Sequence, residues 1–274
     1  MDYVFLGLKA NAYAACGPLI APLLHERTAV VAAQNGIPWW YFHRHGGPYD
    51  GHRLESVDPG GAVSRVLAPE RAVGCVVYAA TELQSPGVVR HLEGTRFSVG
   101  EPDRSLSPRC RDLSEAMRTG GLKCPVGPEL RGDIWIKLFG NISFNPISAL
   151  ARATMRQMCL HGGTRRVIET MMRETLSVAE ALGCAVGVSV ERRLAGAERV
   201  GEEVQVFSRR GSVVAPVWID RALRPGLAFM TMHFPDEVDT NQLTIEANCP
   251  IAGTAEFKAS AIRIEKLPVA TVVR

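Results

Sequence analysis

The sequence predicts an α/β fold with an open parallel sheet, followed by a helical domain and a small β-rich segment at its C-terminal end. Two continuous apolar runs, 3–8 and 28–33, are too short for helices and predict buried parallel strands. An Ala- and Leu-rich stretch between them predicts the connecting helix over 12–24. Beyond Glu202 the residues favour strands again, with Arg-Gly and Pro-Gly turns between them. We therefore expect three parts, 1–124, 125–202 and 203–274.

Within the first part, three further elements are expected from their patterns: a strand over 74–80, a hairpin over 87–100 and an amphipathic helix over 109–120. A proline-rich connector at 124–128 separates them from the helical part. There, Thr164 is expected to cap a helix that reaches Leu182 and stops at Gly183, and a second helix begins near Val190. The tail predicts three strands, over 204–207, 213–219 and 261–264.

Composition excludes several classes of function. The net charge of +3 is small and basic residues occur in no run longer than a pair, so nothing indicates nucleic-acid binding. The longest uncharged stretches contain Gly and Pro and are too short to span a bilayer, so we expect no membrane insertion. Seven cysteines are scattered without a Cys-x-x-Cys pair, which predicts reduced thiols, a cytoplasmic protein and no metal site.

One apolar stretch, 133–150, carries the polar residues Lys137, Asn141 and Asn145 at four-residue intervals. On a helix, each such step advances by only about 40°, so the three side chains form one stripe. The other faces are apolar, which predicts a largely buried helix whose lone ammonium needs a partner. Pro146 lacks an N–H and disfavours helical angles at the residue before it, so we expect a kink or break at Asn145.

Two interpretations of this stripe remain open. Lys137, Asn141 and Asn145 can form a narrow solvated face, which is the usual place for a lysine. Alternatively, they form a site for a small anionic carbonyl compound. In that case the ammonium would polarise or protonate the carbonyl oxygen while the amides fix the orientation of the substrate.

The motif Trp135-x-Lys-Leu-x-x-Asn-x-x-x-Asn-Pro resembles a helix of the second domain of ketopantoate reductases. The resemblance implies NADPH-dependent reduction of 2-dehydropantoate, or a similar 2-keto acid, and a place in pantothenate biosynthesis. It implies that Lys137 gives a proton to the 2-keto oxygen and that Asn141 and Asn145 hold the substrate. The small-molecule keto acid is then the expected partner.

Lys9, Asn35 and Ala80 stand at or near the ends of predicted strands, where ligands of open parallel sheets collect. Taken alone, Lys9 is equally well a solvated loop lysine, and Asn35 a plain turn residue before Gly36. The resemblance to ketopantoate reductases, which continues to Gly201, implies that all three contact the nicotinamide cofactor. It also implies a partial Rossmann-like fold for the first part.

A phosphate-binding Gly-x-Gly-x-x-Gly fingerprint is absent from the sequence. Relative to the family, the chain is expected to start inside the nucleotide-binding domain, without its first βαβ half. We therefore expect weak affinity for the dinucleotide, and site residues retained without activity are an open alternative. A half-sheet exposes unpaired backbone, which predicts poor solubility or a homodimer.

The tail contains short motifs that resemble the C-terminal end of molybdopterin-dependent formate dehydrogenases. They are Ser208-Arg209-Arg210-Gly211, Arg224-Pro225-Gly226-Leu227-Ala228-Phe229-Met230, His233-Phe234, Asn241-Gln242-Leu243-Thr244 and Glu256-Phe257-Lys258. The resemblance implies an alternative function, the binding of part of a molybdopterin guanine dinucleotide. No other candidate ligands cluster around His233, which favours an ordinary histidine over a metal ligand. A third alternative is an inert packing or interaction segment.

Overall fold

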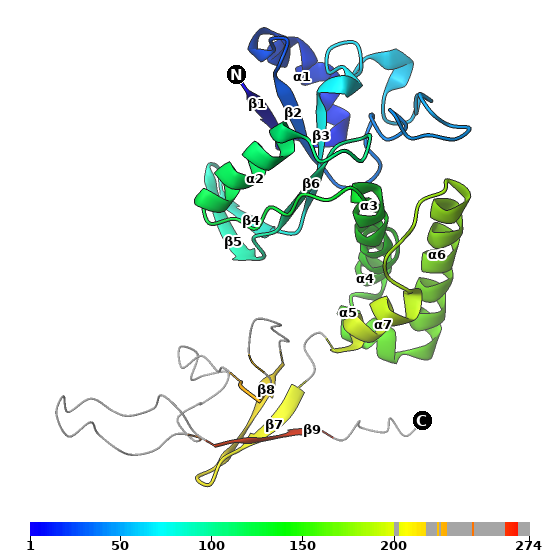
Figure 1. The fold of residues 1–274 in the computed structure, drawn as a ribbon. Helices are drawn as coiled ribbons and strands as arrows, with labels where there is room; N and C mark the ends of the chain where they lie inside the picture. Colours follow the sequence, from blue (N-terminus) through cyan, green and yellow to red (C-terminus); the bar gives the residue numbers. More distant parts are fainter. Residues whose placement is uncertain (200–202, 218–223, 225, 229–242, 244–260, 268–274) are drawn as a thin grey trace, which may run out of the picture. The chain divides into compact units, whose positions relative to one another are not determined.

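A four-stranded sheet organises the N-terminal part of the chain in the computed structural model (Figure 1). Its strand order is β1-β2-β3-β6, and its strands are β1 (Tyr3–Leu6), β2 (Ala29–Ala33), β3 (Ala72–Val77) and β6 (Phe97–Gly100). The first three are parallel, and β6 runs antiparallel to β3. The structure describes residues 1–199, 203–217, 224, 226–228, 243 and 261–267.

Both faces of this sheet are covered, which explains its continuous apolar strands. Side chains alternate between the faces, so Val30 and Ala32 of β2 enter one core while Ala29 and Val31 enter the other. The first core also contains the indoles of two adjacent tryptophans and residues of the helix that starts at Leu130. The second core includes Cys110 and Leu113 from α2 (Pro108–Thr119). The parallel strands expected from the sequence are thereby confirmed.

The connection between β1 and β2 is helical but irregular. It consists of the short turn η1 (Ala10–Ala12), the helix α1 (Tyr13–Ile20) and a second turn, η2 (Ala21–Leu23). Pro18 lies inside α1 and Pro22 lies at the start of η2, so the prolines divide the predicted helix into short segments.

The hairpin predicted over 87–100 differs from the observed pairing. Strand β5 (Val88–Glu93) pairs with β4 (Ala80–Ser85) across a turn at Pro86 and Gly87, whereas β6 joins β3 in the main sheet. The reason is burial, since Ser98, Val99 and Gly100 are buried while every residue of β5 is exposed. The alternating pattern predicted strands correctly but could not decide which strand each would join.

The helical part follows α2 and contains α3 (Leu130–Phe139), the π-helical turn η5 (Gly140–Phe144), α4 (Asn145–Ala151), α5 (Met155–Leu160), α6 (Gly162–Ala181) and α7 (Val190–Arg199). Helix α6 begins two residues before the predicted cap Thr164, and Gly183 follows it with φ +68° as expected for a stop. The predicted helix starting near Val190 is confirmed as α7.

Two units make up the described chain. The first contains Met1–Arg152 and Arg166–Val190, and the second contains Ala153–Arg165 with the described residues from Glu191 onward. The second unit carries an antiparallel sheet of order β8-β7-β9, formed by β7 (Glu203–Phe207), β8 (Ser212–Pro216) and β9 (Arg263–Lys266). Its buried core is Val204, Val206, Val213 and Leu243.

The predicted fold class is therefore confirmed, with a parallel-containing sheet, a helical part and a small β-rich tail (Figure 1). Most of the tail motifs singled out in the sequence, including His233-Phe234 and Glu256-Phe257-Lys258, lie outside the described residues. In the described part of the chain, no helix combines the length and the apolar character needed to span a bilayer.

Candidate functional site

The helix that carries Lys137 does not break at Asn145, contrary to the expectation from Pro146. Asn145 keeps helical angles, φ −60° and ψ −53°, and its N–H bonds to the carbonyl of Gly140, five residues earlier. This widened π-helical turn leads directly into α4, where Pro146 occupies the first turn and no N–H is required of it. The proline is thus accommodated by a local change of helix type, which is a common feature of functional sites.

The apolar setting of Lys137 is confirmed. Trp135, Phe139 and Phe144 are buried, and Lys137 itself is partly buried. Burial lowers the pKa of the Lys137 ammonium, because a charged group loses hydration there. The Nζ atom lies 4.9 Å from the centroid of the Tyr78 ring. Lys137 therefore does not point into bulk solvent.

A cavity of about 350 Å³ lies at the carboxyl ends of the parallel strands, where α3 meets the sheet. This volume falls in the range of small-molecule pockets, roughly 300–1,000 Å³. Lys9 after β1, Asn35 after β2 and Lys137 from α3 share its wall. The full lining is Gly7, Leu8, Lys9, Ala10, Ala33, Gln34, Asn35, Val77, Ala79 and Lys137. Three of the six residues selected from the sequence are thus brought together from separate elements.

The other three lie apart from this wall. Ala80 begins β4, immediately after the lining residue Ala79. Asn141 and Asn145 are neighbours of each other, since Asn145 Nδ2 lies 3.4 Å from Asn141 Oδ1, and Asn145 is exposed. That distance is at the long limit of a hydrogen bond. The two amides therefore continue the helix side that begins at Lys137 without lining the cavity.

Gln34 also lines this cavity, although it was not predicted from the sequence. Its Oε1 atom is buried and has no hydrogen-bond partner. Buried acceptors are nearly always satisfied, so such an atom at a cavity is suited to a donor on a bound molecule. The only signal in the sequence is its place beside Asn35 at a strand end, where glutamine is an unremarkable turn residue.

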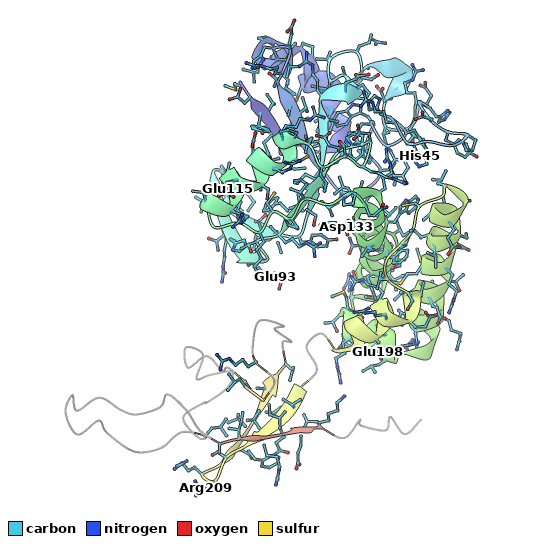
Figure 2. The ribbon with its side chains drawn as sticks, in the orientation of Figure 1. His45, Glu93, Glu115, Asp133, Glu198 and Arg209 are labelled. Carbon is cyan, nitrogen blue, oxygen red and sulfur yellow. The ribbon has the colours of Figure 1, made fainter. Side chains whose placement is uncertain are left out.

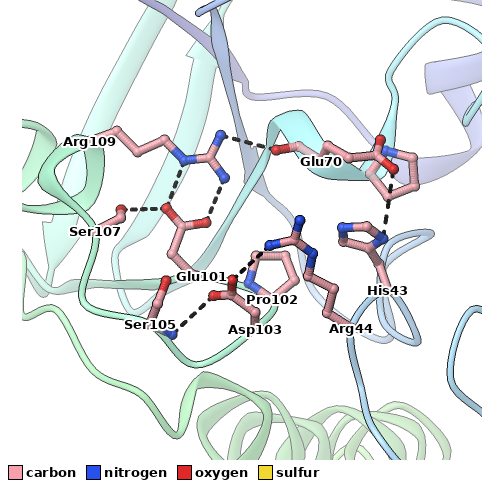
Figure 3. A pocket seen from close by; sticks show the side chains of 10 residues that line it. His43, Arg44, Glu70, Glu101, Pro102, Asp103, Ser105, Ser107 and Arg109 are labelled. Carbon is pink, nitrogen blue, oxygen red and sulfur yellow. Dashed lines mark hydrogen bonds and ion pairs between the residues drawn. The ribbon is translucent and has the colours of Figure 1, made fainter.

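A second cavity, of about 200 Å³, is lined mainly by polar and acidic or basic side chains (Figure 3). Glu101 is buried and paired with Arg109, and Arg44 Nη1 lies 2.9 Å from Asp103 Oδ2. His43 Nδ1 lies 4.0 Å from Glu70 Oε1. Because these groups engage one another, we interpret the cluster as an ion-pair network that joins the loops. Among the described residues, no group of three or more His, Cys, Asp or Glu side chains is placed to hold a metal.

These features define the larger part of the chain as a partial Rossmann-like domain joined to a helical domain, with a cavity at the strand ends. Residues 129–211 match the family model described as "Ketopantoate reductase PanE/ApbA C terminal". The 2-dehydropantoate 2-reductase of Mesorhizobium japonicum is 49% identical over 201 residues, covering 73% of this chain and 62% of that protein. The matched segment is therefore similar to the ketopantoate reductases over about three fifths of their length.

Solved structures agree with this assignment. A structure from Ralstonia solanacearum described as a ketopantoate reductase superposes with a TM-score of 0.70 at 35% identity. The superposition covers 73% of this chain and 62% of the Ralstonia chain. The chain thus spans about three fifths of the length of these relatives.

The tail matches a different family. Residues 195–261 match the model described as "Molydopterin dinucleotide binding domain". The alpha subunit of an F420-dependent formate dehydrogenase from Methanococcus maripaludis is 42% identical over 67 residues, which is 24% of this chain and 10% of that subunit. The resemblance noted for the tail is therefore confirmed, although it concerns only a small piece of the larger enzyme.

Proposed function

We propose that residues 1 to about 202 form a reductase site that converts 2-dehydropantoate, or a similar 2-keto acid, to the 2-hydroxy acid with NADPH. One observation carries the proposal. Lys9, Asn35 and Lys137, all selected from the sequence, share the wall of a single cavity at the strand ends. The 49% identity to a 2-dehydropantoate 2-reductase supports the choice of substrate class.

Lys137 is proposed as the proton donor. A 2-keto acid becomes a 2-hydroxy acid when its carbonyl carbon receives a hydride and its oxygen receives a proton. The lowered pKa of the half-buried ammonium favours release of that proton to the developing alkoxide. Because Lys137 stays partly accessible, water can reprotonate the amine after turnover. Asn141 and Asn145 are proposed to hold the substrate's polar groups through their amides.

Lys9, Asn35 and Ala80 are proposed to contact the nicotinamide end of the cofactor, which supplies the hydride when bound. The unpartnered Oε1 of Gln34 fits this group, since a carboxamide N–H would satisfy it. The phosphates of the cofactor have no comparable site, because the sequence contains no glycine-rich phosphate-binding loop. We therefore propose that the affinity for the nucleotide is weak. We also propose a cytoplasmic location, where NADPH and keto acids are available.

The test is turnover of ketopantoate with NADPH, followed by loss of nicotinamide absorbance. Lys137→Ala should lower kcat by roughly 100-fold or more, the usual contribution of a positioned general acid. The matched control is Lys123→Ala, an exposed lysine outside this cavity, which should leave kcat unchanged. Equal rates for wild type and Lys137→Ala would contradict the proposal. Saturation with NADH at lower concentration than NADPH would contradict the choice of cofactor.

A second function is favoured for the tail by its family-model match over 195–261. We propose that this segment contributes contacts to a pterin dinucleotide. Full-length protein expressed in a molybdopterin-producing host should release a fluorescent oxidised pterin on denaturation, and a chain ending at residue 202 should not. Equal fluorescence from both chains, or none from either, would contradict this function.

A further inference from the structure

The aromatic ring of Tyr78 contacts two cations. The Lys137 Nζ lies 4.9 Å from the ring centroid, and the Arg96 Cζ lies 5.1 Å from it. Both distances are inside the range of about 6 Å at which the negative face of a ring attracts a cation. Tyr78 follows β3 and Arg96 precedes β6, so three separate segments meet at this ring.

Arg96 also engages the acidic residue closest to Lys137 along α3. Its Nη2 lies 3.7 Å from Asp133 Oδ2, and its Nε donates to Ser98 Oγ at 2.9 Å. Asp133 precedes Lys137 by one helical turn, a spacing at which a carboxylate and an ammonium readily pair (Figure 2 labels Asp133 on α3). In the part of the chain that the structure describes, Lys137 forms no ion pair.

The backbone holds the Tyr78 ring in place. The Tyr78 N–H donates to the Arg96 carbonyl at 2.8 Å. Gly94, with φ +76°, lies so close that a Cβ there would collide with the Tyr78 carbonyl oxygen. A glycine is therefore required where the end of β5 approaches the residue that carries the ring.

The remaining groups around Lys137 cannot replace the ring. Cys75 approaches from β3, but burial raises the pKa of its thiol to about 12, so it is neutral near pH 7. Lys9 shares the cavity wall and has the same charge as Lys137. Burial raises the pKa of Asp133, and Arg96 and Ser98 oppose this rise. The ring is thus the attractive contact that the structure provides for the ammonium.

We propose that Tyr78 is a positioning residue that holds the Lys137 ammonium at the cavity wall. Arg96 pairs with Asp133 and thereby leaves the ammonium without a carboxylate partner. An ammonium held by a ring, not by a carboxylate, stays available to an anionic or carbonyl ligand. The catalytic consequence rests on the proposed function above. The positioning itself does not.

Two opposite effects follow. Replacing Tyr78 by Leu keeps apolar bulk but removes the face that stabilises the charged form, so the pKa of Lys137 should fall by about half a pH unit. Replacing Arg96 by Gln removes a nearby cation and releases Asp133 toward Lys137, so the pKa of Lys137 should rise. Tyr78→Phe retains the ring and should leave the pKa unchanged.

The experiment is competitive labelling of the full chain with acetic anhydride between pH 6 and 11, with Lys137 acetylation quantified by mass spectrometry. The midpoint of the labelling curve gives the pKa and needs no turnover. Lys9 and Lys123 in the same samples are internal controls, and thermal melts confirm that each variant is folded. A lower midpoint for Tyr78→Leu with a higher one for Arg96→Gln is the expected result.

Unchanged midpoints, or shifts of the same sign in both variants, would overturn the proposal. A merely structural role for Tyr78 would alter the melts without separating the two midpoints. If the wild type labels as expected but shows no ketopantoate turnover, the proposed function fails while the positioning role stands. The two failures are therefore distinguishable.

Discussion

The guanidinium of Arg109 forms a two-pronged pair with the carboxylate of Glu101: Nε lies 2.7 Å from Oε1, and Nη2 lies 2.5 Å from Oε2 (Figure 3). Arg109 also donates from Nη1 to the carbonyl of Glu70 at 3.1 Å. The pair thus links the start of α2 to the loops before β3 and after β6. Glu101 is only 5% exposed, so its charge depends on this partner.

Arg109→Met should destabilise the protein, because it leaves the buried Glu101 carboxylate without its cation. We expect a loss of about 3 kcal/mol, the low end of the range for broken buried pairs, since Arg109 itself is a third exposed. Chemical unfolding in urea would measure it. Arg118→Met, which breaks an exposed pair with Glu115, is the control and should cost less than about 1 kcal/mol. Equal losses would contradict the structural role of Glu101.

Acid should destabilise the same region. Hydrogen bonds from Ser105, and then Arg44, lower the pKa of Asp103 to about 2. Burial alone would raise the pKa of Glu101, but hydrogen bonds from Arg109 and Ser107 outweigh it, and the pKa falls below 4.5.

Both carboxyls are therefore more acidic in the folded than in the unfolded chain. Their stabilisation is fully present only well above the ordinary values of 4.5 and 3.8, and it is lost as the pH falls through the folded-state pKa values. Melting temperatures measured from pH 6 to pH 2 should drop over this window. Asp103→Asn should show a shallower drop, and an identical profile would count against the assignment.

Gly74 lies in the middle of β3, where there is no room for a side chain. A Cβ would stand 2.3 Å from Leu130 Cδ2 and 2.5 Å from Trp40 Cζ2. Gly74→Ala should cost about 1–3 kcal/mol through overpacking, measured by urea unfolding. Gly127→Ala is the matched control, because a Cβ there meets nothing within 4 Å. If Gly74→Ala left the free energy of unfolding unchanged, α3 would be able to shift away from the sheet at little cost.

Gln34→Leu should separate stability from binding. The substitution removes a buried acceptor that has no partner, so the melting temperature should stay level or rise. If Oε1 accepts from the bound nicotinamide as proposed, NADPH affinity should fall by roughly 2- to 10-fold, the value of one hydrogen bond. Quenching of protein fluorescence by NADPH measures the affinity. Unchanged affinity would remove Gln34 from the site.

Strand β1 forms one edge of the main sheet, with β2 as its neighbour. An open edge pairs readily with another chain, so we expect self-association of the full-length protein as a homodimer. Phe5 on this strand is 47% exposed. Phe5→Lys should shift the sedimentation coefficient toward the monomer at micromolar concentration, whereas Leu19→Lys on α1 should not. A monomeric wild type with a sharp melt would contradict this expectation.

The elements that follow from local pattern were predictable. The apolar run of β2 is buried on both faces, that of β1 on the face of Val4 and Leu6, and Gly183 follows a helix end with a positive φ. The pairing of β6 with β3 was not predictable, because an alternating run indicates a strand without naming its neighbour. Long-range packing decides that choice.

The site was predictable to the extent that its residues lie at strand ends or on one helix stripe. Lys9 and Asn35 share one cavity wall because parallel strands end at a common edge, and Lys137 reaches that wall from α3, which packs against β3. Tyr78 and Gln34 were not predicted. The role of Tyr78 depends on its contact with the Lys137 ammonium, and that of Gln34 on a buried oxygen without a partner, and neither can be read from the spacing of residues in the sequence. The continuous helix through Asn145 was also missed, because a π-helical turn absorbs the constraint imposed by Pro146.

The π-helical turn Gly140–Phe144 also determines how far α4 is rotated about the helix axis relative to α3. Deleting one residue within it would let the segment rewind as a regular α-helix. Everything beyond would then swing by about 100° around the axis, carrying the Asn145 amide away from the side that Lys137 and Asn141 share. The length of this five-residue turn therefore determines whether the Asn145 amide lies on the same side of the helix as Lys137 and Asn141. The alignment of the three side chains depends on that length as well as on which residues they are.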